Sequence, residues 1–123
     1  MIRLINSFKY AWQGIKHCFI SEKNFRIQLL IAAIVFLAGI IFKISATEWL
    51  AILFCSSLVL GFEMINTTIE KLSNLITESI RPEIKIIKDV AAGAVFLASI
   101  ISFVMGCIIF LPKINSLLNN FVK

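Results

Sequence analysis

Residues 90–111, VAAGAVFLASIISFVMGCIIFL, decide the fold because they run for 22 residues without a charge. At about 1.5 Å per residue a helix of that length covers about 33 Å, enough to cross a hydrocarbon core of roughly 30 Å. The chain of 123 residues agrees with a membrane protein: 59% of it is hydrophobic, 15% is charged, and its mean hydropathy is +0.95. These values are not those of an ordinary water-soluble domain.

Two further uncharged runs precede this segment. Residues 27–42 (IQLLIAAIVFLAGIIF) and 49–62 (WLAILFCSSLVLGF) contain 16 and 14 residues, which as helices cover about 24 Å and about 21 Å. Both helices would be shorter than a bilayer core is thick. The first span is therefore expected to include a flanking turn of helix, and the second to include Glu63, Asn66 or both. We predict an all-α membrane protein, a single membrane domain over residues 1–123, with spans at about residues 27–45, 48–70 and 89–111.

Residues 1–20 have the pattern of an amphipathic helix. Apolar residues recur at three- and four-residue spacings from Leu4 to Phe19, and basic and amide side chains occupy the other face. This pattern is typical of a helix that lies in the membrane interface rather than crossing it. A helix that binds a partner protein is the alternative.

The distribution of basic residues predicts the orientation in the membrane. They gather before the first span and in residues 71–88, a polar stretch that contains Pro82 and is predicted to be a loop with a short helical turn. Pro112 is predicted to end the third span and to leave a polar tail. Both basic segments, and with them the N-terminus, are expected to be cytoplasmic, with the C-terminus outside. The basic residues that give the net charge of +5 are therefore expected to set the orientation in the membrane and not to bind nucleic acid.

Glu63, Asn66 and Glu70 stand at positions i, i+3 and i+7 and share one face of the second span, near its cytoplasmic end. A carboxylate at membrane depth costs several kcal/mol unless it is paired, neutralised or bound to a metal. Two carboxylates on one face therefore predict a cation or a substrate. The structural alternative is that Lys or Arg from a neighbouring helix neutralises them.

Glu22, Lys88 and Asp89 lie on the same predicted side of the membrane. Glu22 could complete a two-carboxylate cation site with Glu70, because hard divalent cations take oxygen ligands, or it could be a solvated partner of Lys or Arg. Asp89 suits a helix N-cap, and the free backbone N–H groups behind it could bind a phosphate with help from Lys88. A capped helix with a snorkelling lysine is the alternative.

Several common site patterns are missing from the sequence. It contains neither GxxxxGK[ST] nor GxGxxG, so a nucleotide site must be unconventional. The single histidine, His17, has no partner pattern for a catalytic triad. The three cysteines stand at scattered apolar positions, which predicts neither a disulfide framework nor a zinc site: Cys18, Cys55 and Cys107.

Three blocks of the sequence together carry a resemblance to a known family. They are EKNFR at residues 22–26, EMINTTIE at residues 63–70 and KDVAAGA at residues 88–94. With these blocks the chain resembles the small bacterial diacylglycerol kinases, which include undecaprenol kinases. The N-terminal segment is also similar to that family's surface helix, so the resemblance covers nearly the entire chain; it rests there on Arg3, Tyr10, Trp12 and Gly14.

The resemblance implies a homotrimer of three-span protomers in the bacterial cytoplasmic membrane. Its activity would be transfer of the γ-phosphoryl group of MgATP to the hydroxyl of a membrane lipid, either diacylglycerol or undecaprenol. By the same resemblance Glu63 is the catalytic base and Asn66 assists in the site. A buried carboxylate near lipid depth suits such a base, because the lipid hydroxyl lies where a soluble kinase does not reach.

The resemblance also implies the groups that hold the cofactor and the nucleotide. Glu22 and Glu70 correspond to the ligands of Mg²⁺. Phosphoryl transfer needs charge neutralisation and alignment more than covalent chemistry, so carboxylate-held Mg²⁺ and a lysine can replace a phosphate-cradling loop. Four further residues would contact the nucleotide: Lys88, Asp89, Arg3 and Tyr10.

The chain departs from the family pattern at a few positions. Ser73-Asn74 stands where the motif usually ends in an aspartate, Thr68 replaces a smaller residue, and Gln28 stands where some relatives carry glutamate. There are two alternatives to an active lipid kinase. One is a non-catalytic membrane subunit or cation pathway whose glutamates bind or conduct cations. The other is a family member that has lost its activity.

Overall fold

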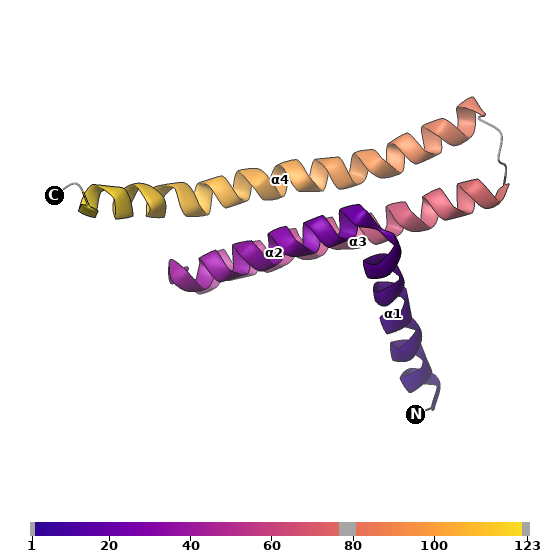
Figure 1. Ribbon diagram of the computed structural model, residues 1–123, viewed down its shortest axis with the longest axis horizontal. Helices are drawn as coiled ribbons and strands as arrows, with labels where there is room; N and C mark the ends of the chain where they lie inside the picture. The colour runs from indigo at the N-terminus through magenta and orange to yellow at the C-terminus, as the bar shows by residue number, and fades with distance from the viewer. Residues whose placement is uncertain (1, 77–80, 122–123) are drawn as a thin grey trace.

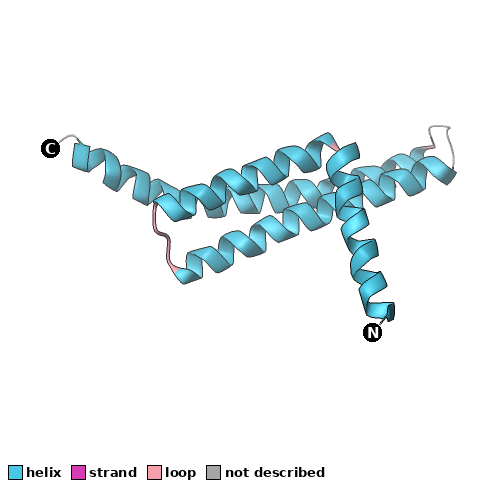
Figure 2. Ribbon diagram, turned by 60° about the horizontal axis from the view of Figure 1, so that its bottom comes forward, coloured by secondary structure: helices cyan, strands magenta, loops and turns pink. Residues whose placement is uncertain are grey.

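The computed structural model describes residues 2–76 and 81–121, and all regular structure in these ranges is helical (Figure 2). Four helices follow one another: α1 (Ile2–Ser21), α2 (Lys23–Ile41), α3 (Ala46–Ile76) and α4 (Pro82–Phe121). The helices α2, α3 and α4 are each long and apolar enough to cross a membrane. The prediction of an all-α protein with three candidate spans is confirmed. The interfacial position of the N-terminal helix and the homotrimer stay predictions.

The three long helices lie side by side, and α1 leaves them at a steep angle (Figure 1). The helix α3 is central, because α4 packs along it on one side and α2 on another. Its buried residues include both apolar and polar side chains: Ile52, Cys55, Glu63, Asn66, Thr67 and Ser73. The fold places the predicted polar face of the second span inside the molecule.

The end of the bundle remote from Glu63 is held by close packing and one ion pair. A Cβ atom at Gly39 would lie 2.8 Å from the Trp49 ring, so only glycine allows α2 to approach α3 this closely. Ser45 and Glu48 cap the start of α3 reciprocally, by bonds of 2.7 and 3.3 Å. The second carboxylate oxygen of Glu48 lies 3.0 Å from Nζ of Lys113 on α4. The Gly39–Trp49 approach joins α2 to α3, and the ion pair joins α3 to α4.

The structure contradicts the predicted loop over residues 71–88. The helix α3 continues to Ile76, and α4 already begins at Pro82; residues 77–80 lie outside the described ranges. Proline is favourable at the first helical position, where its missing N–H needs no partner, and Glu83 in the same turn suits the positive helix N-terminus. Polar residues thus extend α3 and α4 as a helical hairpin beyond the start of α2.

The structure also contradicts the expectation that the last helix ends at Pro112, because α4 runs through this proline to Phe121. A proline inside a helix removes one backbone hydrogen bond, and neighbouring helices can offset that loss in a membrane protein. Here the residues on both sides of Pro112 are held by packing. Phe110 lies edge-on to Phe42, with ring centroids 6.0 Å apart, and Lys113 pairs with Glu48.

Candidate functional site

The site is centred on two buried residues of α3, one turn apart. Glu63 is 4% exposed and Asn66 is 8% exposed. Glu70, one turn further along, is partly exposed, so the stripe runs from the buried part of the bundle towards its surface. Burying a carboxylate in this way requires compensating partners.

Neutral amides supply those partners. Nε2 of Gln28 on α2 donates to Oε2 of Glu63 over 3.0 Å, and Nδ2 of Asn66 donates to Oε1 of Glu70 over 3.2 Å. Among the described residues, no Lys or Arg forms an ion pair with either carboxylate. The described part of the chain therefore does not show the alternative in which a neighbouring basic residue neutralises the stripe.

Each of these amides leaves a buried oxygen without a hydrogen-bond partner in the described structure: Oε1 of Gln28 and Oδ1 of Asn66. An unsatisfied buried acceptor costs about 1–3 kcal/mol. A water, a ligand or a cation from outside the chain could supply the missing partner. The Asn66 oxygen belongs to the residue bonded to Glu70, and amide and carboxylate oxygens are the ligands that Mg²⁺ prefers.

Glu22 is the one residue between α1 and α2, and it is paired rather than free. Ser21 Oγ donates to Glu22 Oε1 over 2.8 Å, and Lys71 Nζ on α3 lies 3.4 Å from the same oxygen. The serine hydroxyl, and then Lys71, hold the pKa of Glu22 below its usual value although partial burial opposes this. Lys71 also contacts His17 and Ser21. The cluster fastens the α1–α2 junction to α3.

The described residues of this single chain hold no group of three or more His, Cys, Asp or Glu that could bind a metal. Of the two predicted metal ligands, Glu70 is bonded to Asn66 and Glu22 to Lys71. A cation that bound Glu22 through Oε1 would compete with Lys71 for that oxygen.

Asp89 does not cap a helix, which corrects the prediction made from the sequence. The helix α4 begins at Pro82, about two turns earlier, so Asp89 lies in its interior and the backbone N–H groups behind it bond within the helix. The Asp89 carboxylate instead pairs with Lys85, 2.6 Å away. A phosphate cradle of free backbone N–H groups at this point is excluded.

Lys88 bridges α4 and α3 at the same end of the molecule. Its Nζ donates to Oδ1 of Asn74 over 3.3 Å. Asn74 is one of the residues that depart from the family pattern, so this departure lies in direct contact with the lysine predicted to hold the nucleotide.

The other two predicted nucleotide contacts, Arg3 and Tyr10, are exposed on α1, which points away from the bundle (Figure 1). Cys18 is the residue of α1 that is buried near the site, at 5% exposure. Arg3 lies about 22 Å from Cys18 along the helix, and Tyr10 about 12 Å. One chain alone therefore does not bring Arg3 and Tyr10 to Glu63.

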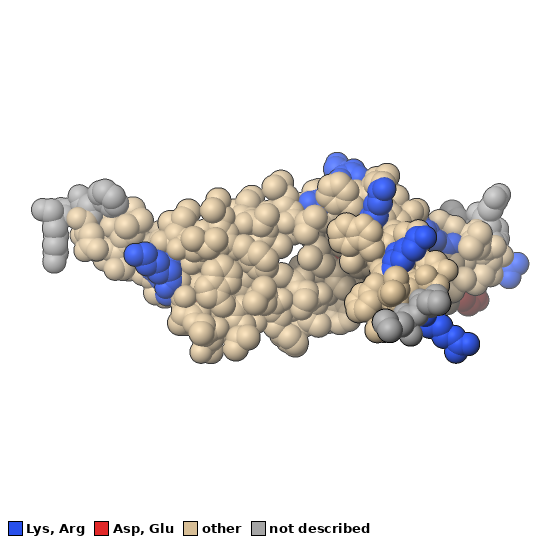
Figure 3. Space-filling view, turned by 90° about the horizontal axis from the view of Figure 1, so that it is seen from below, with Lys and Arg blue, Asp and Glu red and all other residues tan. Residues whose placement is uncertain are grey.

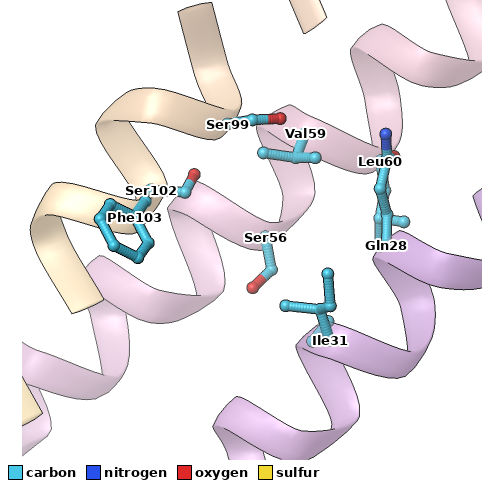
Figure 4. Close-up of a pocket in the computed structure, with 9 residues that line it drawn as sticks. Gln28, Ile31, Ser56, Val59, Leu60, Ser99, Ser102 and Phe103 are labelled. Carbon is cyan, nitrogen blue, oxygen red and sulfur yellow. The ribbon is translucent and has the colours of Figure 1, made fainter. Parts of the chain in front are cut away.

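A cavity of about 240 Å³ opens between α2, α3 and α4 beside Gln28 (Figure 4). Its walls are largely apolar, and Ser99 and Ser102 on α4 donate their hydroxyls to backbone oxygens of their own helix, over 2.8 and 2.7 Å. One side chain, Gln28, both lines this cavity and bonds Glu63.

Basic residues gather at the site end of the molecule. Figure 3 shows Lys and Arg clustered around α1 and the helical hairpin, a long uncharged band, and a small basic patch towards the other end. The described basic residues at the site end are Arg3, Lys9, Lys16, Lys23, Arg26, Lys71, Arg81, Lys85 and Lys88.

Two site residues had no predicted role in the chemistry, Gln28 and Lys71. Gln28 stands out in the sequence as the polar residue in the uncharged run of residues 27–42, and this could have marked it. Lys71 follows Glu70 directly, and only the folded chain shows that it reaches back to Glu22.

A family model for prokaryotic diacylglycerol kinase matches residues 9–110. The chain is 37% identical over 112 residues to undecaprenol kinase of Bacillus subtilis, which covers 91% of each chain. It is 34% identical over 113 residues to diacylglycerol kinase of Haemophilus influenzae, covering 89% of this chain and 94% of that one. It is 35% identical over 116 residues to diacylglycerol kinase of a Synechocystis species, covering 94% of this chain and 66% of that one.

Proposed function

This chain belongs to the prokaryotic diacylglycerol kinase family and is a multi-pass membrane lipid kinase, and we propose that it transfers the γ-phosphoryl group of MgATP to a lipid hydroxyl at Glu63. The observation that carries the proposal is a buried carboxylate held by a neutral amide where α2 begins. The lipid is diacylglycerol or undecaprenol, which are the substrates that the names of the relatives give.

Glu63 is suited to act as the general base. One of its oxygens accepts a hydrogen bond from Gln28, and the other is left for the substrate. In the reaction the free oxygen takes the proton of the lipid hydroxyl as the hydroxyl oxygen bonds to the γ-phosphorus, and the bond from that phosphorus to the ADP oxygen breaks. A buried carboxylate meets a lipid hydroxyl at a depth that water-borne bases do not reach.

Mg²⁺ would be held by Glu70 and Glu22, with Asn66 beside them. The unpartnered Asn66 oxygen next to Glu70 supports this assignment, since its chemistry suits a hard cation. When bound, the ion neutralises the negative charge of the transferring phosphate. Few protein ligands are needed, because Mg²⁺ usually keeps several waters and takes oxygens from the nucleotide.

The nucleotide would be held by side chains, in the absence of a backbone cradle at residues 88–94. Lys88 and Asp89 would bind it at the hairpin. Arg3 and Tyr10 would contribute to the site of a neighbouring protomer in a homotrimer, because within one chain they lie far from Glu63. The largely uncovered surface of α2, where only Phe25, Ala32 and Gly39 are buried, supports packing against further copies.

The enzyme would lie in the bacterial cytoplasmic membrane with its N-terminus and site facing the cytoplasm. The gathering of basic residues at the site end supports this orientation, because cytoplasmic segments carry an excess of Lys and Arg (Figure 3). The three spans then place the C-terminus outside.

Transfer of labelled γ-phosphate from MgATP, measured in parallel mixed micelles containing diacylglycerol or undecaprenol, tests the proposed function. Label in one of the lipids supports it and identifies the substrate. Nucleotide binding without label in either lipid would contradict it and indicate a family member that has lost its activity. A folded protein that binds cations but no nucleotide would instead favour the cation-binding alternative.

A further inference from the structure

We propose that Gln28 is a positioning residue that fixes the carboxylate of Glu63 for proton transfer. The role of Glu63 as base rests on the proposed function, whereas the hold of Gln28 on the carboxylate does not. The contact joins two helices, since Gln28 stands on α2 and Glu63 on α3, and it measures 3.0 Å from Nε2 to Oε2. A bond between helices orients the carboxylate in a way that its own helix does not.

The donor is neutral, and this suits a base. Lys or Arg in the same place would stabilise the ionised carboxylate so strongly that it would accept a proton poorly, whereas an amide fixes its direction at a smaller cost in basicity. The bond also fixes which end of the amide faces Glu63, because a carbonyl oxygen against a carboxylate would be repulsive.

The remaining surroundings of Glu63 leave this role to Gln28. Among the described groups of other helices, the thiol of Cys18 on α1 senses the charge of Glu63. Burial raises the pKa of that thiol, so it stays neutral around pH 7. On α3 itself Glu70 is occupied by Asn66, and no described basic residue pairs with Glu63.

Gln28 also stabilises the fold less than an apolar residue would at this position. Its Oε1 atom is buried without a partner in the described structure. An apolar side chain of the same size would fill this place without an orphaned acceptor. What the glutamine adds is the hydrogen bond to Glu63.

The test replaces Gln28 by Met, which is similar in size but cannot donate. The hydrophobic reagent dicyclohexylcarbodiimide reacts with protonated carboxyl groups, and mass spectrometry of peptides locates the product. At about pH 8, Gln28→Met should label Glu63 several-fold faster than the wild type, because the ionised form has lost a donor. In the phosphate-transfer assay, kcat should fall about tenfold while KM for ATP and for the lipid changes less than about twofold.

Two matched controls separate this role from general packing effects. Gln13→Met makes the same chemical change at an exposed site on α1, and Ser99→Ala alters the cavity without touching Glu63. Both should keep the wild-type labelling rate and kcat. If Gln28→Met does not fold, Gln28→Glu replaces it: two adjacent carboxyl groups would share a proton, and labelling of Glu63 should again be faster.

Labelling of Glu63 at the wild-type rate in a folded Gln28 variant would overturn the proposal, as would a rise in KM with kcat unchanged. A wild-type protein that transfers no phosphate would contradict the proposed function alone. In that case the labelling rate still decides whether Gln28 holds the carboxylate.

Discussion

Two amide–carboxylate pairs, Gln28 with Glu63 and Asn66 with Glu70, satisfy the acidic stripe of α3. A hydrogen bond to a charged group contributes about 1.5–3 kcal/mol, without the charge compensation that a lysine would bring. No described basic residue therefore neutralises the charge of an ionised carboxylate in this stripe. A site that accepts a proton and binds a divalent cation needs negative charge. A carboxylate with only a structural role would be more stable if a basic residue neutralised it.

Asn66→Ala tests the second pair. The substitution removes the donor that orients Glu70 and the orphaned oxygen beside it, so the Mg²⁺ concentration for half-maximal activity should rise about tenfold, as for other groups that orient metal ligands. The measurement is a Mg²⁺ titration of phosphate transfer at saturating ATP. Thr68→Ala is the control, since this exposed hydroxyl donates only to its own helix. An unchanged Mg²⁺ dependence in Asn66→Ala would contradict the assignment.

The sequence predicted the polar residues of α3 better than their partner on α2. Glu63 and Glu70 are conspicuous because a carboxylate in an apolar helix is costly. Gln28 carries no charge, and its partner stands 35 positions away on another helix, so its role depends on how α2 packs on α3. The place of Lys88 beside Asn74 likewise follows from the hairpin and not from either residue alone.

At the scale of the helices, the junction of α1 and α2 is a single residue fastened by polar contacts. Arg26 donates to the backbone oxygens of Phe19 and Ile20, over 3.2 and 2.9 Å, where α1 ends and its carbonyls lack helical partners. Glu22 supplies the turn and reaches Lys71 on α3. These bonds set the angle at which α1 leaves the bundle.

Acid should loosen this junction. Because the pKa of Glu22 is lowered in the folded chain, its contribution to stability is fully present above the ordinary value of about 4.3 and is lost as the pH falls through the lower folded value. Hydrogen exchange of the junction amides, corrected for intrinsic rates, should therefore accelerate between about pH 5 and about pH 3 in the wild type and not in Glu22→Gln. The same acceleration in both proteins would contradict this account.

Hydropathy predicted that three helices span the membrane, but it misplaced where they end. Charge and polarity predict that the second span ends at residue 70, whereas water tolerates a polar helix and α3 continues to Ile76. Pro82 is predicted to lie in a loop, although its position opens α4. Asp89 was then assigned to a helix start that lies further back. Each error came from treating the membrane boundary as the end of the helix.

At the scale of the whole molecule, basic residues are distributed unequally between the two ends of the helical bundle. Basic residues crowd the end that holds Glu63, while the described basic residues at the other end are Lys43 and Lys113 (Figure 3). A long apolar band separates the two ends. A lipid that diffuses in the bilayer and a nucleotide that arrives from water can meet only at such a boundary.

A reporter fused after Lys123 tests the proposed orientation in the membrane. The excess of Lys and Arg at the site end predicts a cytoplasmic N-terminus, and three spans then place the reporter outside. A periplasmic reporter such as an alkaline phosphatase should be active in this fusion, and the same reporter at the N-terminus should be inactive. Activity of the N-terminal fusion alone would reverse the proposed topology.

Phosphate transfer by Glu63→Gln tests the central claim most directly. The substitution keeps the size of the side chain and an oxygen that can accept from Gln28, but it removes the group that takes the lipid proton. Measured in mixed micelles beside the wild type, with folding and assembly checked in both, we expect the variant to lose at least about a hundredfold in kcat while it still binds MgATP. Near-normal turnover by a folded Glu63→Gln protein would contradict the account.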